Sequence, residues 1–353
     1  MITSYKQRVK SFWELFCTEE ADFRSLIDEG NHTQAFARLR PMLDLISIGS
    51  FELNASKTDD SKYELVMSGE GDLTTIFMIS YCMAHTPEEI SEKWIFHGTR
   101  PRLEGDFGIE MHGISLSAED FLIYPALNKT NKKVDISIYC SKFKGLSEEK
   151  KQELMFIYLD SLIGETYTIA YIGKIDLLGS KKIFKKHITL ANLYQYIEEI
   201  IKENGWEKIN DPCEWGCVYE QKSEDTEEVR NDIFIGYSNN MDIIRHFYTN
   251  KSWFKEILNT GVSFGFLYYD NTEISTERLA EYRGEFEERV VEALQTINVA
   301  TLIGGGTGIK NSYIDFIIFD EAEFISLITG LNLTEEKFYY RNFIDGSEII
   351  KIN

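Results

Sequence analysis

The sequence has few of the residues that build disulfide frameworks or metal sites. It contains five cysteines and six histidines in 353 residues. The cysteines are odd in number and scattered, which excludes a disulfide framework, and Cys213 and Cys217 have three residues between them, unlike the pairs of zinc ribbons. No two histidines have the spacing of a paired metal-binding motif. We therefore expect no metal site and no cofactor.

Long apolar runs are also missing. The N-terminal stretch MITSYKQRVKSFWELF contains basic residues but no continuous apolar segment after them, unlike a secretory signal peptide. No segment approaches the roughly 18 uninterrupted apolar residues that a membrane-spanning helix requires. These absences predict a protein of a reducing cytoplasm that does not enter a membrane.

Positive charge is scarce. The chain has 37 lysines and arginines against 58 aspartates and glutamates, which gives a formal net charge of −21. Such a surface repels phosphate backbones and anionic lipids, so binding to nucleic acid or to a membrane is disfavoured. A basic partner protein is instead attracted. The alternative is that the excess of carboxylates serves solubility alone.

The residues that are present indicate a globular chain with more than one core. Hydrophobic residues make up 43% and aromatic residues 13%, and the length exceeds what one hydrophobic core usually supports. Residues 220–232, EQKSEDTEEVRND, are rich in charge and poor in apolar side chains, which is typical of a domain boundary. We predict an α+β protein of two domains, residues 1–220 and 221–353, each a mainly antiparallel or mixed sheet with helices packed on it.

Hydrophobic periodicity places the secondary structure. In the N-terminal half it predicts helices near residues 9–29, 36–46, 73–83, 147–162 and 190–203, and strands that include a hairpin at 50–56 and 62–68 and a long strand at 166–178. In the C-terminal half it predicts strands at 232–238, 262–270, 299–304 and 312–320 and helices at 241–258, 276–297 and 321–331.

A glycine-rich segment, LIGGGTGIKNSYIDFIIFD at residues 302–320, is the most conspicuous motif. It lacks the Gly-Lys-Ser/Thr of a P-loop, its third position does not complete a dinucleotide fingerprint, and a strand rather than a helix follows it. Two interpretations remain: a backbone nest that binds an anion, or a tight, bulged connection within a hairpin. The candidate ligand-binding residues are Gly304, Gly305, Gly306, Gly308, Lys310 and Asp315.

Asp315 lies in an otherwise apolar strand and has two interpretations of its own. It either contacts the glycine-rich loop, where it would position a metal or a hydroxyl, or it forms a structural pair with an arginine such as Arg283. No serine lies in a recognisable nucleophile elbow of the GxSxG type, and no catalytic Cys/His/Asn set is recognisable, so we expect no catalytic residues.

The sequence therefore favours a non-catalytic binding protein, immunity-like or regulatory toward a basic partner. The alternative is a small-molecule or phosphate-binding protein, or an enzyme, that uses loop 304–308. The sequence gives no basis for an oligomeric state.

Three phrases resemble motifs of uncharacterised bacterial proteins of unknown function. They are YELVMSGEGDLTTIF at residues 63–77, EKWIFHGTRP at 92–101 and the glycine-rich segment at 302–320. In that group a strand, a GEG or AEG turn, a helix and a tryptophan follow one another in the N-terminal half. The resemblance covers most of residues 10–210; it implies a bacterial cytosolic protein and assigns no activity to any residue.

Overall fold

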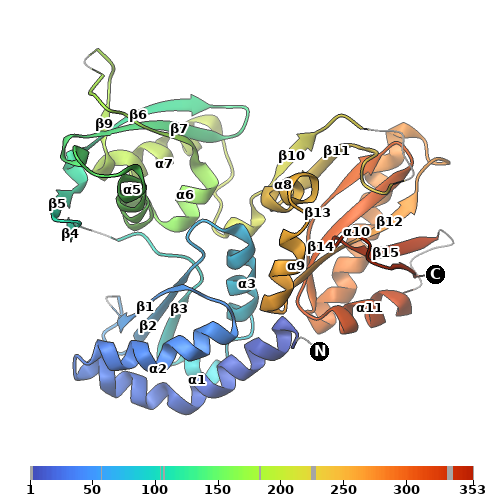
Figure 1. Ribbon diagram of the computed structural model, residues 1–353, viewed down its shortest axis with the longest axis horizontal. Helices are drawn as coiled ribbons and strands as arrows, with labels where there is room; N and C mark the ends of the chain where they lie inside the picture. The colour runs from blue at the N-terminus through green and yellow to red at the C-terminus, as the bar shows by residue number, and fades with distance from the viewer. Residues whose placement is uncertain are drawn as a thin grey trace. The chain divides into compact units, whose positions relative to one another are not determined.

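The computed structural model describes residues 3–56, 58–103, 105, 108–182, 184–223, 228–331 and 337–352. Its fold is α+β, as predicted (Figure 1). Contacts group the chain into two compact units. Unit 1 comprises Met1–Ala21, Arg38–Ser47 and Gly216–Asn353, and unit 2 comprises Asp22–Ala37 and Ile48–Trp215. The division into two domains, residues 1–220 and 221–353, stays a prediction.

Helices α1 (Tyr5–Asp28) and α2 (His32–Leu45) each contribute residues to both units. Within unit 1, the N-terminal end of α1 is tied to the rest of the unit by backbone hydrogen bonds. The amide of Tyr5 donates to the carbonyl of Gly261, and the amide of Lys6 donates to the carbonyl of Phe319. An N-terminal segment therefore belongs to the same unit as the C-terminal sheet.

Unit 2 contains a three-stranded sheet of order β1-β2-β3. Strands β1 (Ser50–Ala55) and β2 (Tyr63–Ser68) form the predicted antiparallel hairpin, whereas β3 (Trp94–His97) pairs with β2 in parallel. Helix α3 (Leu73–Met83) matches the predicted range. It begins there because the Asp72 carboxylate accepts hydrogen bonds from the amides of Thr74 and Thr75. The short helix α4 (Glu88–Ser91) precedes β3.

A second sheet of unit 2 has the order β8-β7-β6-β9, and helices pack on it around a shared apolar core. The strands are β6 (Phe121–Asn128), β7 (Lys133–Cys140), β8 (Ile172–Leu177) and β9 (Ile188–Thr189), with a separate hairpin of β4 (Gly108–Met111) and β5 (Ile114–Ser117). The helices are α5 (Glu148–Ile163), α6 (Glu165–Tyr171) and α7 (Leu193–Asn204).

The predicted strand at residues 166–178 is wrong in its first half, which forms helix α6. The stretch is rich in β-forming Thr, Tyr and Ile, but Tyr167, Ala170 and Tyr171 are buried with the spacing of one helical face. Burial of that face outweighs intrinsic strand propensity. Only the second half, β8, is extended.

Unit 1 is built on one seven-stranded sheet of order β10-β11-β13-β14-β12-β15-β16, in which every described pair of neighbours is antiparallel. Strands β10 and β16 form its two edges. The strands are β10 (Cys217–Glu220), β11 (Ile233–Ser238), β12 (Ser263–Asp270), β13 (Ala300–Gly308), β14 (Asn311–Ile318), β15 (Phe338–Asn342) and β16 (Ile349–Lys351).

Helices cover both faces of this sheet (Figure 1). Helices α10 (Leu279–Ile297) and α11 (Glu321–Gly330) bury Phe286, Val290 and Phe324 on one face. On the other face, α8 (Met241–Thr249) and α9 (Trp253–Ile257) join an aromatic cluster of Phe247, Phe254, Phe264, Phe266 and Phe343. The single helix predicted at residues 241–258 is therefore two helices.

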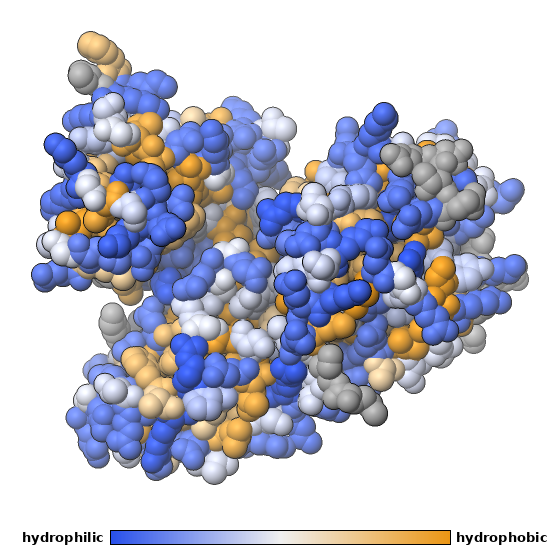
Figure 2. Space-filling view, in the orientation of Figure 1, coloured by the Kyte–Doolittle hydropathy of each residue, from blue (hydrophilic) through white to orange (hydrophobic). Residues whose placement is uncertain are grey.

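The surface is largely hydrophilic on the face drawn in Figure 2, where orange areas interrupt a blue majority. This agrees with a chain in which charged residues make up 27% of the sequence. Individual exposed apolar residues are ordinary on protein surfaces, whereas exposed apolar residues that lie together can mark a binding surface.

Candidate functional site

The glycine-rich segment does not form the predicted loop. Gly304, Gly305, Gly306 and Gly308 all lie within strand β13, which pairs with β11 on one side and β14 on the other. The register shifts between Leu302 and Gly304, so the predicted bulge is present although the glycines themselves are in the strand. Their backbone lies in the interior of a sheet, between two hydrogen-bonded neighbouring strands.

Close approach of neighbouring atoms explains why these positions are glycines. A Cβ atom on Gly304, where φ is +145°, would lie 2.1 Å from the carbonyl oxygen of Tyr237. A Cβ on Gly305 would lie 2.4 Å from the carbonyl oxygen of Tyr313, and one on Gly308 would lie 2.3 Å from a carboxylate oxygen of Asp232. Each distance is shorter than a Cβ atom tolerates, so packing alone requires glycine here.

The turn that joins β13 to β14 binds a carboxylate of the chain itself, that of Asp232. The Asp232 carboxylate accepts hydrogen bonds from the backbone amides of Lys310 and Asn311 at 2.9 and 3.0 Å. It also accepts one from the Tyr313 hydroxyl, and the carbonyl of Asp232 accepts from the amide of Ile309. The amides that the loop interpretation offered to a phosphate are thus occupied by Asp232.

Asp315 lies on β14, directly opposite Gly304 in the β13–β14 register. It is 2% exposed and forms a bidentate ion pair with Arg230, which is fully buried; the Nη2–Oδ2 distance is 3.0 Å. Asp315 thus pairs with Arg230 rather than with Arg283. Arg283 instead donates a hydrogen bond to Glu287. The predicted ligand-binding roles of Gly304, Gly305, Gly306, Gly308, Lys310 and Asp315 stay predictions.

Arg230 lies in a box of aromatic rings. The distances from its guanidinium carbon to the ring centroids are 4.7 Å for Phe343, 5.1 Å for Phe266, 5.3 Å for Phe247 and 5.5 Å for Tyr313. Burial alone would lower the pKa of Arg230, but the adjacent carboxylate outweighs it, so the pKa of the guanidinium is raised. Both members of the pair are buried and hydrogen-bonded to each other, which suits a structural role.

The sequence interpretation missed Arg230 and Asp232, because both belong to the segment assigned to a domain boundary. The available signal was the return of apolar residues at Val229 and Ile233, which flank these charges. Residues 224–227 of the same segment lie outside the described residues.

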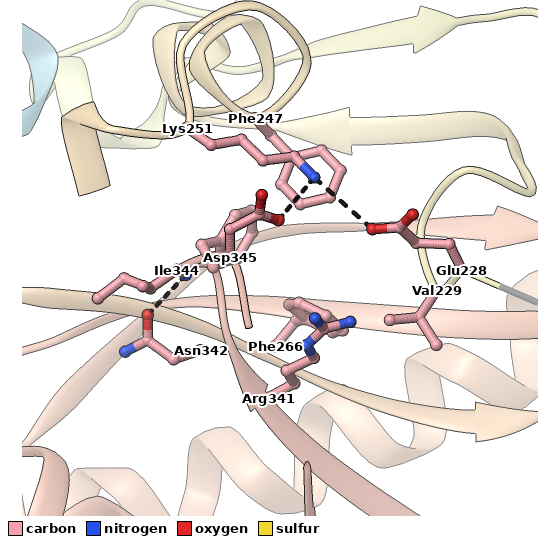
Figure 3. Close-up of a pocket in the computed structure, with 10 residues that line it drawn as sticks. Glu228, Val229, Phe247, Lys251, Phe266, Arg341, Asn342, Ile344 and Asp345 are labelled. Carbon is pink, nitrogen blue, oxygen red and sulfur yellow. Dashed lines mark hydrogen bonds and ion pairs between the residues drawn. The ribbon is translucent and has the colours of Figure 1, made fainter. Parts of the chain in front are cut away.

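A shallow depression lies near this ion pair (Figure 3). Lys251, between α8 and α9, extends toward Asp345 and Glu228, with Nζ–oxygen distances of 3.0 and 3.8 Å. Phe247 and Phe266 also line it. Its volume is about 10 Å³, which is room for about one water molecule. The depression is therefore too small to be a ligand site.

A larger cavity, of about 180 Å³, lies beside β13 on the side of α10. Arg283 and Glu287 extend into it from α10 and are joined by a hydrogen bond of 2.9 Å between Nε and Oε1. Arg283 also donates to the Thr307 hydroxyl at 3.0 Å. Burial raises the pKa of Glu287, and Arg283 opposes that effect. The lining residues are Tyr237, Asn239, Arg283, Glu287, Leu302, Gly304 and Gly305.

Exposed apolar side chains lie next to this cavity on strands β10 and β11. Val218 and Tyr237 are directly opposite each other in the register, and Ile235, two residues from Tyr237, is on the same face. Their exposed fractions are 65%, 39% and 38%. Glu220, opposite Ile235, adds a carboxylate. We refer to Val218, Glu220, Ile235 and Tyr237 as the edge patch.

Unit 2 holds a separate buried acidic pair. The Glu165 carboxylate accepts hydrogen bonds from the amides of Arg100 at 2.8 Å and Gly71 at 3.3 Å. Asp160 is 6% exposed and lies 3.7 Å from the Arg100 guanidinium. Burial, reinforced by the charge of Glu165, raises the pKa of Asp160 to about 6. The GEG turn at residues 69–71 thus contributes an amide that holds Glu165 in place.

Two classes of site are missing from the part of the chain that the structure describes. No group of three or more His, Cys, Asp or Glu side chains is arranged to hold a metal ion there. No described helix combines the length and the apolar character needed to cross a membrane. Comparison with family models, curated proteins and solved structures gives no match to this chain.

Proposed function

We propose that this chain is a non-catalytic binding protein of the bacterial cytoplasm that captures a basic partner protein, in an immunity-like or regulatory role. The edge patch carries the proposal. It places three exposed apolar side chains and one carboxylate on the edge strand β10 and its neighbour β11, in a protein whose net charge is −21. Apolar contacts supply affinity, and the acidic field speeds the approach of a cationic partner and excludes anionic ones.

The position of the patch supports binding through an added strand. Among the described strands, β10 pairs with β11 alone, so its outer side offers backbone groups to an incoming extended segment. An uncovered edge with apolar side chains promotes aggregation unless a partner covers it. Lysine or arginine side chains of that segment would lie near Glu220.

A cross-linking experiment tests the proposal. A photo-reactive amino acid replaces Tyr237 in the full chain, and the protein is irradiated in cells of the source organism. The matched control carries the same amino acid at Ile349, which is 49% exposed on the opposite edge strand β16. We expect one basic protein to be attached at Tyr237 and not at Ile349. When the irradiation is repeated in a lysate of the same cells, the yield should fall as salt is added. Attachment at neither position, or only of acidic proteins, would contradict the proposal.

A further inference from the structure

The cavity beside β13 has the features of a small-ligand site, and it shares Tyr237 with the edge patch. Its walls come from three elements: α10 provides charge, β11 and the residue after it provide Tyr237 and Asn239, and β13 provides Leu302 and bare glycine backbone. All three elements belong to unit 1. The site is therefore set within one compact unit.

The two charged residues of the cavity leave hydrogen-bonding capacity unused. Arg283 donates from Nε to Glu287 and from Nη1 to Thr307, and the Nη2 group makes no hydrogen bond to the described residues. Glu287 accepts through Oε1, and its Oε2 atom likewise accepts none from them. With exposed fractions of 16% and 24%, both side chains are largely desolvated yet still reachable. Partial desolvation strengthens charge-assisted hydrogen bonds to a guest.

The opposite charges of Arg283 and Glu287 together determine which class of small molecule can bind. A ligand with a single negative charge would be attracted by Arg283 but repelled by the Glu287 carboxylate. A ligand with a single positive charge would be attracted by Glu287 but repelled by Arg283. A molecule that carries both charges satisfies both residues at once, with its carboxylate on Arg283 and its ammonium on Glu287. Charges of opposite sign then alternate around the site.

Size excludes the larger ligands. The cavity volume is about 180 Å³. Pockets for drug-sized ligands and cofactors usually enclose about 300–1,000 Å³. Nucleotides and dinucleotides therefore do not fit, whereas a free amino acid does.

We propose that the cavity binds a small zwitterion of amino-acid size. Its carboxylate is held by Arg283 and its ammonium by Glu287, and its side chain packs against Tyr237 and Leu302. Asn239 adds polar contact at the rim. This site goes beyond the proposed partner capture: Tyr237 belongs to both sites, whereas the charged residues Arg283 and Glu287 lie outside the edge patch.

Calorimetry with the full chain tests this assignment. The standard L-amino acids are first screened by thermal shift, because a ligand that binds the folded state raises the melting temperature. Each hit is then titrated beside two relatives, the amine that lacks the carboxylate and the acid that lacks the amine. We expect at least one amino acid to bind with one site per chain and each relative to bind at least roughly tenfold more weakly, since each loses one charge-assisted hydrogen bond.

Variants on α10 add a second measurement. Arg283→Gln and Glu287→Gln should abolish binding of the hit, whereas Arg289→Gln and Glu288→Gln, which alter exposed neighbours on the same helix, should preserve it. The proposal is overturned if no amino acid binds, if a singly charged relative binds as tightly, or if both cavity variants retain binding. The comparison of each amino acid with its related amine and acid uses the unaltered protein. It therefore tests the proposal even if a variant fails to fold.

Discussion

Arg230 and Asp315 form a bidentate ion pair between a residue of the segment before β11 and the middle of β14, in a site where neither side chain is more than 2% exposed. Four aromatic rings surround the guanidinium. The pair joins residues that are 85 positions apart in the chain. It therefore fixes the segment before β11 onto the central strands of the sheet.

Removing one member of this pair should be strongly destabilising. Asp315→Asn leaves the buried charge of Arg230 without a counter-ion, and we expect the free energy of unfolding to fall by about 3–5 kcal/mol. Replacing both residues by apolar ones, Arg230→Met with Asp315→Leu, should restore part of the loss because no charge remains buried. Urea denaturation measures both changes.

An exposed ion pair on the same unit provides the control. Arg278 and Glu281 are 60% and 70% exposed and 3.8 Å apart. Arg278→Ala should lower the free energy of unfolding by less than about 1 kcal/mol. If Asp315→Asn costs no more than Arg278→Ala, the buried pair does not have the structural role assigned to it.

Asp232 should be needed for the β13–β14 turn. Its carboxylate accepts from the amides of Lys310 and Asn311 and from the Tyr313 hydroxyl. Asp232→Asn replaces an acceptor by an NH₂ group that faces donors, and we expect a loss of about 1–3 kcal/mol in unfolding free energy. Hydrogen exchange should show faster opening at residues 309–311 in the variant, and unchanged exchange there would refute the assignment.

Strand β13 allows a direct test of whether its glycines are required by close packing. Gly305→Ala places a methyl group 2.4 Å from the carbonyl oxygen of Tyr313, so it should destabilise the fold by about 1–3 kcal/mol. Gly284→Ala in α10 is the matched control, because a Cβ there has no neighbour within 4 Å. That substitution should be neutral or stabilise by about 0.5–1 kcal/mol. Equal melting temperatures for the two variants would contradict the packing explanation.

Stability should depend on pH through Asp160. Its folded-state pKa is raised to about 6, above the ordinary value of 3.8, so the folded protein holds the proton more tightly than the unfolded chain does. The contribution of Asp160 to stability is therefore fully present below pH 3.8 and is lost as pH rises to about 6. Asp160→Asn should raise the free energy of unfolding at pH 7 by about 2–3 kcal/mol and flatten its dependence over this window.

Urea denaturation at several pH values between 4 and 7 measures this effect. Asp176→Asn, which removes an exposed carboxylate of the same unit, serves as the control and should leave the profile unchanged. A variant of Asp160 with the wild-type pH profile would show that the carboxyl ionises freely in the folded protein.

Local patterns predicted the order of many helices and strands well. The period-two hairpin at β1–β2 and helix α3 follow from residues adjacent in sequence. Such features depend on side chains only a few positions apart, and a single sequence contains that information.

The site could not be predicted in the same way, because its parts meet only through the sheet topology. The glycine run suggests a loop when judged by local propensity, yet β13 is a central strand whose neighbours approach too closely for side chains. Arg230 is in a charged segment that suggests a linker, and its partner Asp315 is set by the register of distant strands. The cavity likewise depends on how α10 crosses the sheet.

The most direct test of the proposed function is the affinity for the basic protein that cross-links at Tyr237. The double variant Val218→Ser, Glu220→Lys removes an apolar contact and reverses a charge in the edge patch. Glu348→Lys, Ile349→Ser makes the same kind of change on the opposite edge, where both residues are exposed. We predict that the first variant raises Kd by roughly tenfold or more and that the second leaves it unchanged. Equal Kd values for the two variants would contradict capture through strand β10.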